Sequence, residues 1–371
     1  MPPSSKSHKI LLAGVVPPPV HGQSMATKAL FDEDFPSIEK ILIEIRSSKE
    51  LKQVGRLSPS KVFGLIGIVA LTWMQWLKHR PTVLYYTAGS GAWVPFARDF
   101  LFLGLCRPLF RRTLIHYHSG DLVEFLAKSP FRSAMGKFIY GRGAWSIRLG
   151  KHCPAPIYAN TKVFDVSNGV KAPASFPPRK VRDSFRILFL GNLFEEKGVI
   201  DLIQAVKIAA TDHPSPITLT LMGSWPSENV RLKTEALLAD LPANVTSPPP
   251  APAYGDEKWQ ALATHDILVF PSYYRSENLP LILIEAMAAS LPVIATDWRG
   301  IKSLVENEVT GLLVPTHAPA ALAAAIKRLA DRPALRNAMG ATARLHYEQH
   351  LTSECYLNAM HDVFIAAFAR S

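Results

Sequence analysis

The sequence has 371 residues, of which 48% are hydrophobic and 19% are charged. This length corresponds to about two domains, and the apolar content excludes an intrinsically disordered chain. Residues 1–180 hold 25 Lys and Arg against 10 Asp and Glu, whereas the remainder holds 16 against 20. The basic half indicates an anionic partner, namely nucleic acid, an acidic membrane surface or a phosphorylated substrate, although solvated lysines that keep a protein soluble give the same composition.

The beginning of the chain predicts a protein without a signal peptide. The stretch MPPSSKSHKILLAGVV has a short apolar core and no small-residue cleavage pattern. The three cysteines, Cys106, Cys153 and Cys355, are odd in number and far apart. This spacing fits neither a disulfide framework nor a clustered zinc site, so we expect a protein of the reducing cytoplasm.

The first expected strand, Lys9–Val16, leads into a loop that is rich in proline. The loop sequence PPPVHGQSMATKAL opens a helix near Gln23. Gly22 within it lets a backbone come close to a ligand, while a glycine in such a loop is also typical of a simple turn.

Two apolar stretches of the first half suit a membrane surface. Val62–Leu77 carries no charge over 16 residues, which is shorter than the ~20 residues of a membrane-spanning helix. Trp93–Arg112 interleaves aromatic and aliphatic residues with arginines, as interfacial helices do. Both stretches are equally typical of helices in a protein core.

Two further motifs follow expected strands of the first half. The sequence AGSGAW at Ala88–Trp93 lacks the third glycine of a dinucleotide-binding loop, which argues against a nicotinamide dehydrogenase. The sequence LIHYHSGD brings His116, His118 and Asp121 to the end of the fourth strand. These side chains suit a metal, but no further ligand cluster supports one, so we expect no metal. A histidine at a strand end is otherwise most often part of the hydrogen-bonded scaffold.

Strand-like runs alternate with helical patterns through both halves, which predicts parallel sheets with helical crossovers. The expected strands are Lys9–Val16, Lys40–Ile45, Thr82–Thr87, Thr113–His118, Val163–Ser167, Phe185–Gly191, Ile217–Gly223, Asp266–Ser272, Pro292–Asp297 and Gly311–Pro315. The predicted fold class is therefore α/β, with two facing Rossmann-like doubly wound domains and a cleft between them. Ligands of such folds lie at the carboxyl ends of the strands.

The Pro-rich, basic stretch at residues 169–183 is typical of an interdomain linker. We expect an N-terminal domain over residues 1–178 and a C-terminal domain over residues 179–350. Residues 351–371 are expected to form a C-terminal helix that packs back toward the N-terminal domain.

The strand ends of the second half carry three charged candidates. Lys197 precedes a helix, where an ammonium group and the helix N-terminus together favour a diphosphate, although a single lysine in a loop is commonly just exposed. Glu277 precedes a second helix, and Glu285 lies inside it among apolar residues. Because a buried carboxylate needs a partner, Glu285 binds either the hydroxyls of a ribose or sugar, or a cation such as Lys197, Arg275 or Arg299.

These motifs resemble a known enzyme family. GNLFEEKG, then ENLPLILIEAMAASLPVIAT with seven residues between its two glutamates, then GIKSLVENEVTGLLVP, are similar to the donor-binding half of the retaining family 4 glycosyltransferases with the GT-B fold. The PPPVHGQS opening resembles bacterial surface-polysaccharide enzymes of this kind.

The resemblance implies a donor-binding set and a catalytic set of residues. Lys197 is expected on the diphosphate, the backbone amides near Asn278 and Leu279 on the phosphate, Glu277 on the sugar and Glu285 on the ribose. The donor-binding set is Gly22, Gly191, Asn192, Lys197, Asn278, Leu279 and Glu285, and the catalytic set is His118, Glu277 and Lys197. Asn192 stands where the family usually has Arg, and Ser303 where it has Glu, so one phosphate-binding cation is missing.

The expected function is metal-independent, cofactor-free and retaining transfer of a sugar from a nucleotide sugar to a glycan or a lipid-diphosphate-linked saccharide. We expect this at the cytoplasmic face of an inner membrane with an anionic surface. The alternatives are a nucleotide-sugar epimerase or phosphorylase on the same fold, and a non-enzymatic nucleic-acid-binding protein. The last of these leaves Glu285 unexplained and shows no nucleic-acid motif, so no nucleic-acid partner is expected.

Overall fold

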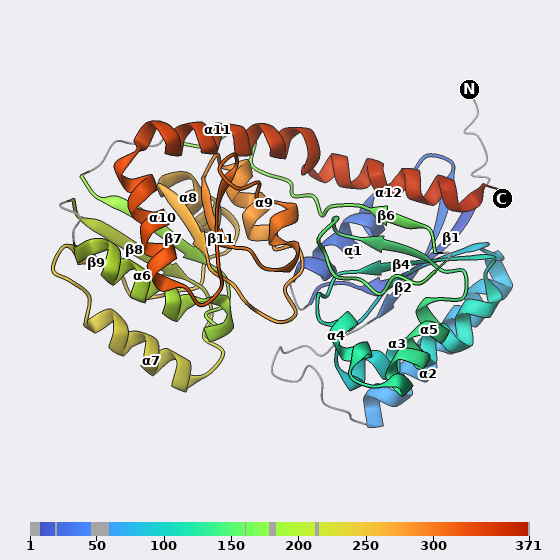
Figure 1. Cartoon of the computed structure of the whole chain (residues 1–371). Helices are drawn as coiled ribbons and strands as arrows, with labels where there is room; N and C mark the ends of the chain where they lie inside the picture. Colours follow the sequence, from blue (N-terminus) through green and yellow to red (C-terminus); the bar gives the residue numbers. More distant parts are fainter. Residues whose placement is uncertain are drawn as a thin grey trace. The chain divides into compact units, whose positions relative to one another are not determined.

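The computed structural model describes residues 8–18, 21–45, 59–159, 161–177, 183–211 and 215–369 (Figure 1). The chain divides into two compact units. The first unit comprises residues 1–168 and 354–371, and the second comprises residues 169–353. Within the described ranges each unit holds one sheet of six strands, all paired in parallel. The α/β prediction with two Rossmann-like domains is confirmed.

The sheet of the first unit has the strand order β2-β1-β3-β4-β5-β6. Its strands are β1 (His8–Val15), β2 (Ile38–Ile45), β3 (Val83–Thr87), β4 (Arg112–Tyr117), β5 (Trp145–Arg148) and β6 (Val163–Asp165). Continuous apolar runs such as ILLAGV form these strands because both faces of a parallel sheet are covered by helices.

Helices cover both faces of this sheet (Figure 1). One face packs against α2, α3, α4 and α5, and the other face packs against α1 and the C-terminal helix α12. The elements are α1 (Gly22–Asp32), α2 (Pro59–His79), α3 (Trp93–Cys106), the short 3₁₀ helix η2 (Arg107–Leu109), α4 (Leu122–Ala127), α5 (Pro130–Tyr140) and α12 (Ser353–Phe368). Tyr356, Met360 and Phe364 of α12 are buried among the side chains of α1 and the sheet.

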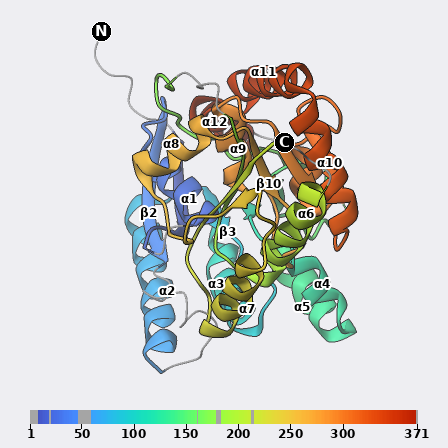
Figure 2. The same ribbon diagram turned by 90° about the vertical axis from the view of Figure 1, so that its left-hand side faces the viewer.

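The sheet of the second unit has the order β12-β11-β10-β7-β8-β9. Its strands are β7 (Phe185–Leu190), β8 (Ile217–Met222), β9 (Val245–Thr246), β10 (Ile267–Phe270), β11 (Val293–Thr296) and β12 (Gly311–Val314). Its helices are η3 (Glu195–Lys197), α6 (Val199–Thr211), α7 (Glu228–Ala239), α8 (Gly255–Thr264), α9 (Leu281–Ala288), η4 (Arg299–Ser303), α10 (Pro319–Asp331) and α11 (Pro333–His350). Figure 2 shows α6 and α7 on one side of this unit, and α8 and α9 on the other.

All ten expected strands are present, with ends that differ from the structure by at most two residues. Two further strands, β5 and β9, are not among the expected ones and have four and two residues. Such short segments show no alternation or apolar run that distinguishes them from loops.

The strand order places one loop pair of each unit at a topological switch point. In the second unit β7 continues to β8 on one side, whereas β10 continues to β11 on the other. The loops that follow β7 and β10 therefore separate in opposite directions and leave a crevice for ligands at the carboxyl edge of the sheet. In the first unit β1 and β3 have the same relationship.

The apolar stretches of the first half form α2 and α3. No helix within the described ranges is both long and apolar enough to cross a bilayer. The inner sides of the two helices pack on the core, through side chains such as Ile68 and Phe102. Their outer sides expose Ile66, Trp73, Met74, Leu77, Leu101 and Leu105. The interpretation as core helices is thus confirmed for the inner sides, and the interfacial interpretation of the outer sides stays a prediction.

Candidate functional site

The switch point of the second unit brings Lys197 and Glu277 together. Lys197 ends η3, in the loop after β7, and Glu277 lies in the loop after β10. The Lys197 ammonium donates a hydrogen bond to Oε2 of Glu277 in an ion pair in which both side chains are largely buried. The Ser272 hydroxyl donates to the same oxygen at 2.9 Å. Two residues predicted to bind one ligand are thus neighbours, and they form an ion pair with each other.

The backbone around Lys197 is tightly constrained. Gly198, between η3 and α6, has a φ of 82°, a left-handed conformation that favours glycine. A Cβ atom at this position would overlap the Pro271 carbonyl. The close approach of the two loops therefore requires glycine here, and it holds the Lys197 side chain over the ring of Tyr274, at 4.9 Å from its centroid.

The start of α9 faces the same edge of the sheet. Pro280 is the N-cap of α9 and makes no side-chain cap hydrogen bond. The first amides of a helix carry partial positive charge and favour an anion. Asn278 and Leu279, the predicted phosphate contacts, are buried directly before this helix start. Gly191 and Asn192 follow β7 at the same edge of the sheet, and Gly191 donates its amide to Met222.

Glu285 has a protein partner that the sequence analysis did not name. Its Oε1 atom lies 2.6 Å from Nζ of Lys258 on α8, and the residue is only 8% exposed. Burial raises the pKa of the Glu285 carboxyl, and the charge and hydrogen bond of Lys258 oppose this shift. The sequence left two partners open for Glu285, either ligand hydroxyls or a protein cation. The structure shows an ion pair with a cation, but that cation is Lys258 and not Lys197, Arg275 or Arg299. No sequence pattern links Lys258 to Glu285, because the contact depends on the packing of α8 against α9.

In the first unit, His118 follows the end of β4 and lies against His116. The ring centroids of the two histidines are 4.1 Å apart. The Nδ1 atom of His116 is 2.9 Å from the Tyr85 hydroxyl. Both ring nitrogens of His118 are buried, and among the described residues neither has a hydrogen-bond partner. Burial, followed by the charge of His21, lowers the pKa of His118 to about 3. His118 is therefore a neutral imidazole at physiological pH, with two ring nitrogens for a ligand to use.

Gly22 is the first residue of α1. His21 caps this helix through its Nδ1 atom, which accepts the amide of Ser24, while the Ser24 hydroxyl accepts the amide of His21. Burial lowers the pKa of His21. The sequence analysis assigned no role to His21, although its position directly before the helix was a signal for a cap.

The AGSGAW loop after β3 is held by two carboxylates of the protein itself. Asp99 accepts the Gly89 amide at 2.7 Å, and Asp121 accepts the Gly91 amide at 2.7 Å. These amides therefore do not form an open phosphate cradle, which agrees with the argument against a dehydrogenase. The residues that the structure describes contain no group of three or more His, Cys, Asp or Glu arranged to hold a metal.

The sequence of the second unit matches a known family. Residues 171–346 match the profile of the glycosyl transferases of group 1. The D-inositol 3-phosphate glycosyltransferase of Paenarthrobacter aurescens is 32% identical over 224 residues, which cover 57% of this chain and 52% of that protein. The enzyme of the same name from Streptomyces scabiei is 34% identical over 199 residues, which cover 49% and 43%. The chain thus spans about half the length of these curated relatives.

Solved structures share the fold over nearly the whole chain. A glycosyltransferase from Rickettsia africae superposes with a TM-score of 0.74 at 15% identity and covers 98% of this chain and 100% of that one. The sucrose-phosphate synthase of Thermosynechococcus elongatus gives 0.69 at 20% identity, with 98% and 100% covered. Anabaena HepE in complex with UDP and glucose gives 0.65 at 15% identity, with 97% and 100% covered. These likenesses establish the two-domain GT-B fold. By its residues 171–346, this chain is similar to the group 1 glycosyl transferases.

Proposed function

We propose that this protein is a glycosyltransferase that moves a sugar from a nucleotide-sugar donor to a glycan or lipid-linked saccharide, with retention of configuration and without a metal. The family of the second unit supports the reaction class. The observation that carries the proposal is the Lys197–Glu277 ion pair at the switch point of the second sheet, beside the start of α9.

In the proposal, the ion pair provides a cation for the diphosphate of the donor and a carboxylate for its sugar hydroxyls. A diphosphate replaces the Glu277 carboxylate as the partner of Lys197, since it carries more negative charge and reaches the same ammonium. The released Glu277 then accepts hydrogen bonds from sugar hydroxyls. Glu285 takes the ribose in the same way, with Lys258 keeping its carboxylate ionised.

The chemistry requires stabilisation of charge on the leaving group. As the bond between the sugar and the diphosphate breaks, negative charge grows on the phosphate oxygens, and fixed cations and helix N-termini stabilise it. Lys197 and the first amides of α9 serve this role in the proposal. Asn192 supplies no charge at a position where the family that this sequence resembles usually has Arg. Lys197 therefore provides a larger share of the stabilisation of the leaving phosphate. Gly22 and His118 retain the contacts that the resemblance implies, with the donor phosphate and the transferred sugar.

The proposed acceptor is anionic and lies at the cytoplasmic face of an acidic membrane. The excess of basic residues in the first 180 positions supports this. The exposed apolar side chains of α2 and α3 support it as well. An acceptor that carries a phosphate group, as the name of the curated relatives implies for them, suits the same basic unit.

Donor binding is tested by thermal shift and calorimetry against a panel of nucleotide sugars and free nucleoside diphosphates. We expect one nucleotide family to stabilise the protein, and Lys197→Met to weaken its binding by roughly 10- to 100-fold. The matched control is Lys207→Met on α6, whose ammonium pairs with the exposed Asp240. Equal loss in both variants, or no nucleotide binding at all, would contradict the proposal.

The reaction class is tested by incubating the donor with and without acceptors. Conversion of the donor sugar without an acceptor would identify an epimerase instead, and a requirement for inorganic phosphate would identify a phosphorylase. A donor that stays intact until an acceptor is added supports the transferase.

A further inference from the structure

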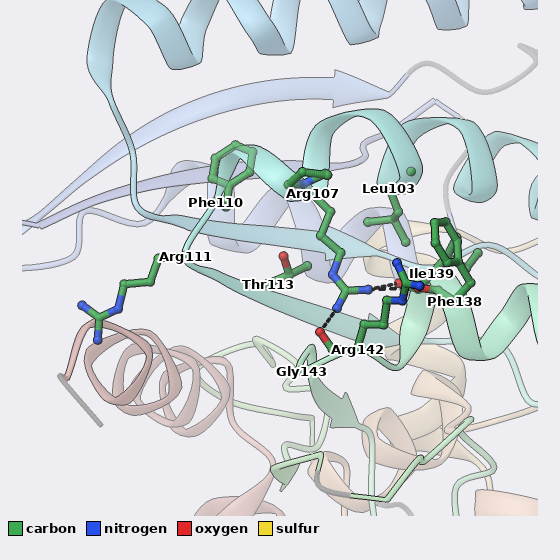
Figure 3. A pocket seen from close by; sticks show the side chains of 11 residues that line it. Leu103, Arg107, Phe110, Arg111, Thr113, Phe138, Ile139, Arg142 and Gly143 are labelled. Atoms are coloured by element: carbon green, nitrogen blue, oxygen red, sulfur yellow. Dashed lines mark hydrogen bonds between the residues drawn. The ribbon is translucent and has the colours of Figure 1, made fainter.

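The first unit contains a pocket that the proposed reaction does not use. It has a volume of about 250 Å³ and lies among α3, η2, α5 and the start of β4 (Figure 3). Pockets that enclose a whole small ligand measure roughly 300–1,000 Å³. This pocket therefore suits one part of a larger molecule.

The walls of the pocket combine apolar side chains with polar groups. Leu103, Phe110 and Ile139 are buried side chains that line it, and Phe138 stands at its edge with much of its ring exposed. Gly104 contributes a wall without a side chain, and a Cβ atom added there would meet no other atom within 4 Å. The space beside Gly104 is thus open to an apolar group.

Three arginines, Arg107, Arg111 and Arg142, also line the pocket, and its lining contains no acidic residue. Within the described part of the chain, none of the three forms an ion pair with a carboxylate. Figure 3 shows Arg107 and Arg142 beside each other, with Arg111 pointing away from them. The carboxylates of the described residues therefore do not pair with these three cations.

The two neighbouring arginines have different surroundings. Arg107 donates to the carbonyl groups of Ile139 and Gly141 at 2.8 and 2.9 Å, so it is fixed against the end of α5. Burial lowers the pKa of Arg107, and the charge of Arg142 lowers it further. Arg142 is exposed and lies over the Phe138 ring, 4.3 Å from its centroid. Arg142 pairs with no carboxylate of the described residues and can contact an anion, and Arg107 adds a fixed charge beside it.

The pocket is remote from the residues assigned to catalysis in this unit. Thr113, which lines it, is near the start of β4, whereas His118 follows the end of that strand. Five residues of extended strand separate these positions by about 16 Å. A ligand in the pocket therefore lies at the opposite edge of the sheet from His118.

The pocket mouth resembles a membrane-binding surface. The exposed side chains of Leu101 and Leu105 lie on α3 and that of Phe138 on α5. Exposed apolar side chains on the two helices that also line the pocket, together with arginines that pair with no described carboxylate, match an amphiphile that has an apolar chain and an anionic head. We propose that this pocket binds an anionic phospholipid, with part of an acyl chain beside Gly104 and the phosphate on Arg142. This inference rests on the membrane association in the proposed function and names its lipid partner.

A side chain that fills the pocket distinguishes lipid binding in the pocket from vesicle binding to the protein surface. Vesicles of phosphatidylcholine and phosphatidylglycerol in a 3:1 ratio are co-sedimented with the wild-type protein, with Gly104→Leu and with Gly67→Leu. Gly67 is a matched control, since it is an exposed helix glycine on α2 with open space around it and does not line the pocket. We expect Gly104→Leu to lower the vesicle partition coefficient at least fivefold, and Gly67→Leu to leave it unchanged or raised.

The headgroup contact is tested by a pair of charge variants. Arg142→Gln is compared with Lys151→Gln, which removes the same charge from an exposed position of the first unit outside the pocket. We expect the first variant to lose at least three times as much affinity for the vesicles as the second. Equal losses would mean that binding follows net charge alone and would overturn the pocket assignment.

A soluble lipid tests the pocket without a membrane. Dihexanoyl phosphatidylglycerol below its critical micelle concentration should bind saturably by calorimetry to the wild-type protein and at least tenfold more weakly to Gly104→Leu. Glycerol 3-phosphate, which has the charge without the chains, should bind at least tenfold more weakly than the lipid. Equal binding of glycerol 3-phosphate, or an unaffected Gly104→Leu, would overturn the proposal.

Nucleotide binding is measured in the same variants to separate the two proposals. If nucleotides bind and no variant differs on vesicles, the lipid pocket is wrong and the transferase stands. If the pocket variants behave as expected while no nucleotide binds, the proposed function is wrong.

Discussion

The ammonium group of Lys258 lies 2.6 Å from a carboxylate oxygen of Glu285, inside a unit where α9 is otherwise apolar and buried. A charge in such surroundings is stable when it is paired, and it becomes costly once its partner is removed. Lys258 is therefore the residue that stabilises the ionised carboxylate of Glu285 on α9.

Lys258→Met should destabilise the protein by about 2–3 kcal/mol, because it leaves a buried carboxylate without its cation while keeping most of the side-chain volume. The free energy of unfolding from urea titration at pH 7 measures this change. Lys302→Met is the control, since Lys302 pairs with Asp297 in an exposed position, and such pairs contribute roughly 0–1 kcal/mol. Similar losses in both variants would show that the Glu285 pair has no special role.

The same variant should have an altered pH dependence. Burial holds the pKa of Glu285 above its ordinary value, and the loss of Lys258 raises it further. A group with a raised pKa in the folded state stabilises most below its unfolded pKa and loses this contribution as the pH rises. The stability deficit of Lys258→Met should therefore shrink from pH 7 to pH 5. The double variant with Glu285→Gln should lack this trend, and a deficit that grows in acid would contradict the assignment.

Glu277→Gln should affect binding of the nucleoside diphosphate and turnover of the nucleotide sugar differently. The substitution removes the carboxylate that competes with phosphate for Lys197, so the affinity for the free nucleoside diphosphate should stay the same or rise by up to roughly tenfold. Turnover of the nucleotide sugar should fall by roughly 100-fold or more, since the proposed function places this carboxylate on the sugar. Calorimetry and steady-state kinetics measure the two effects, and a parallel loss of both would remove Glu277 from the sugar site.

Asp99 should be essential for the stability of the first unit. This fully buried carboxylate accepts hydrogen bonds from the hydroxyls of Tyr86 and Tyr140 and from the Gly89 amide. Asp99→Asn replaces an acceptor with a donor and should cost about 3 kcal/mol. Asp165→Asn, which affects the exposed partner of Arg148, should cost about 1 kcal/mol or less. Chemical denaturation of both variants tests the difference.

His118 should remain neutral across the physiological range. With a folded pKa of about 3 below an unfolded value near 6.5, its contribution to stability is complete above pH 6.5 and is lost as the pH falls. At pH 5 the loss amounts to about 2 kcal/mol. Nuclear magnetic resonance titration of the ring protons should show no protonation of His118 above pH 5, and a midpoint near 6 would contradict this.

The strands and their order of appearance could be predicted from the sequence. Continuous apolar runs such as those of β1 and β7 identify strands covered on both faces, and their alternation with helical patterns indicates parallel sheets. The positions after those strands also made Lys197, Glu277 and His118 candidate site residues, because the carboxyl ends of parallel strands share one edge. The exposed sides of α2 and α3 could not be assigned, since both a core helix and an interfacial helix are rich in apolar residues.

The partners of the charged residues were decided by tertiary structure. A local pattern shows that Glu285 needs a partner, yet Lys258 lies 27 residues away on a separate helix. The Lys197–Glu277 pair likewise depends on β7 and β10 being neighbours. The sequence by itself determined which groups are charged, apolar and at strand ends, because these are local properties of the chain. Only the folded structure decided which charges meet, because each ion pair forms within a few ångströms and the packing of distant elements sets that distance.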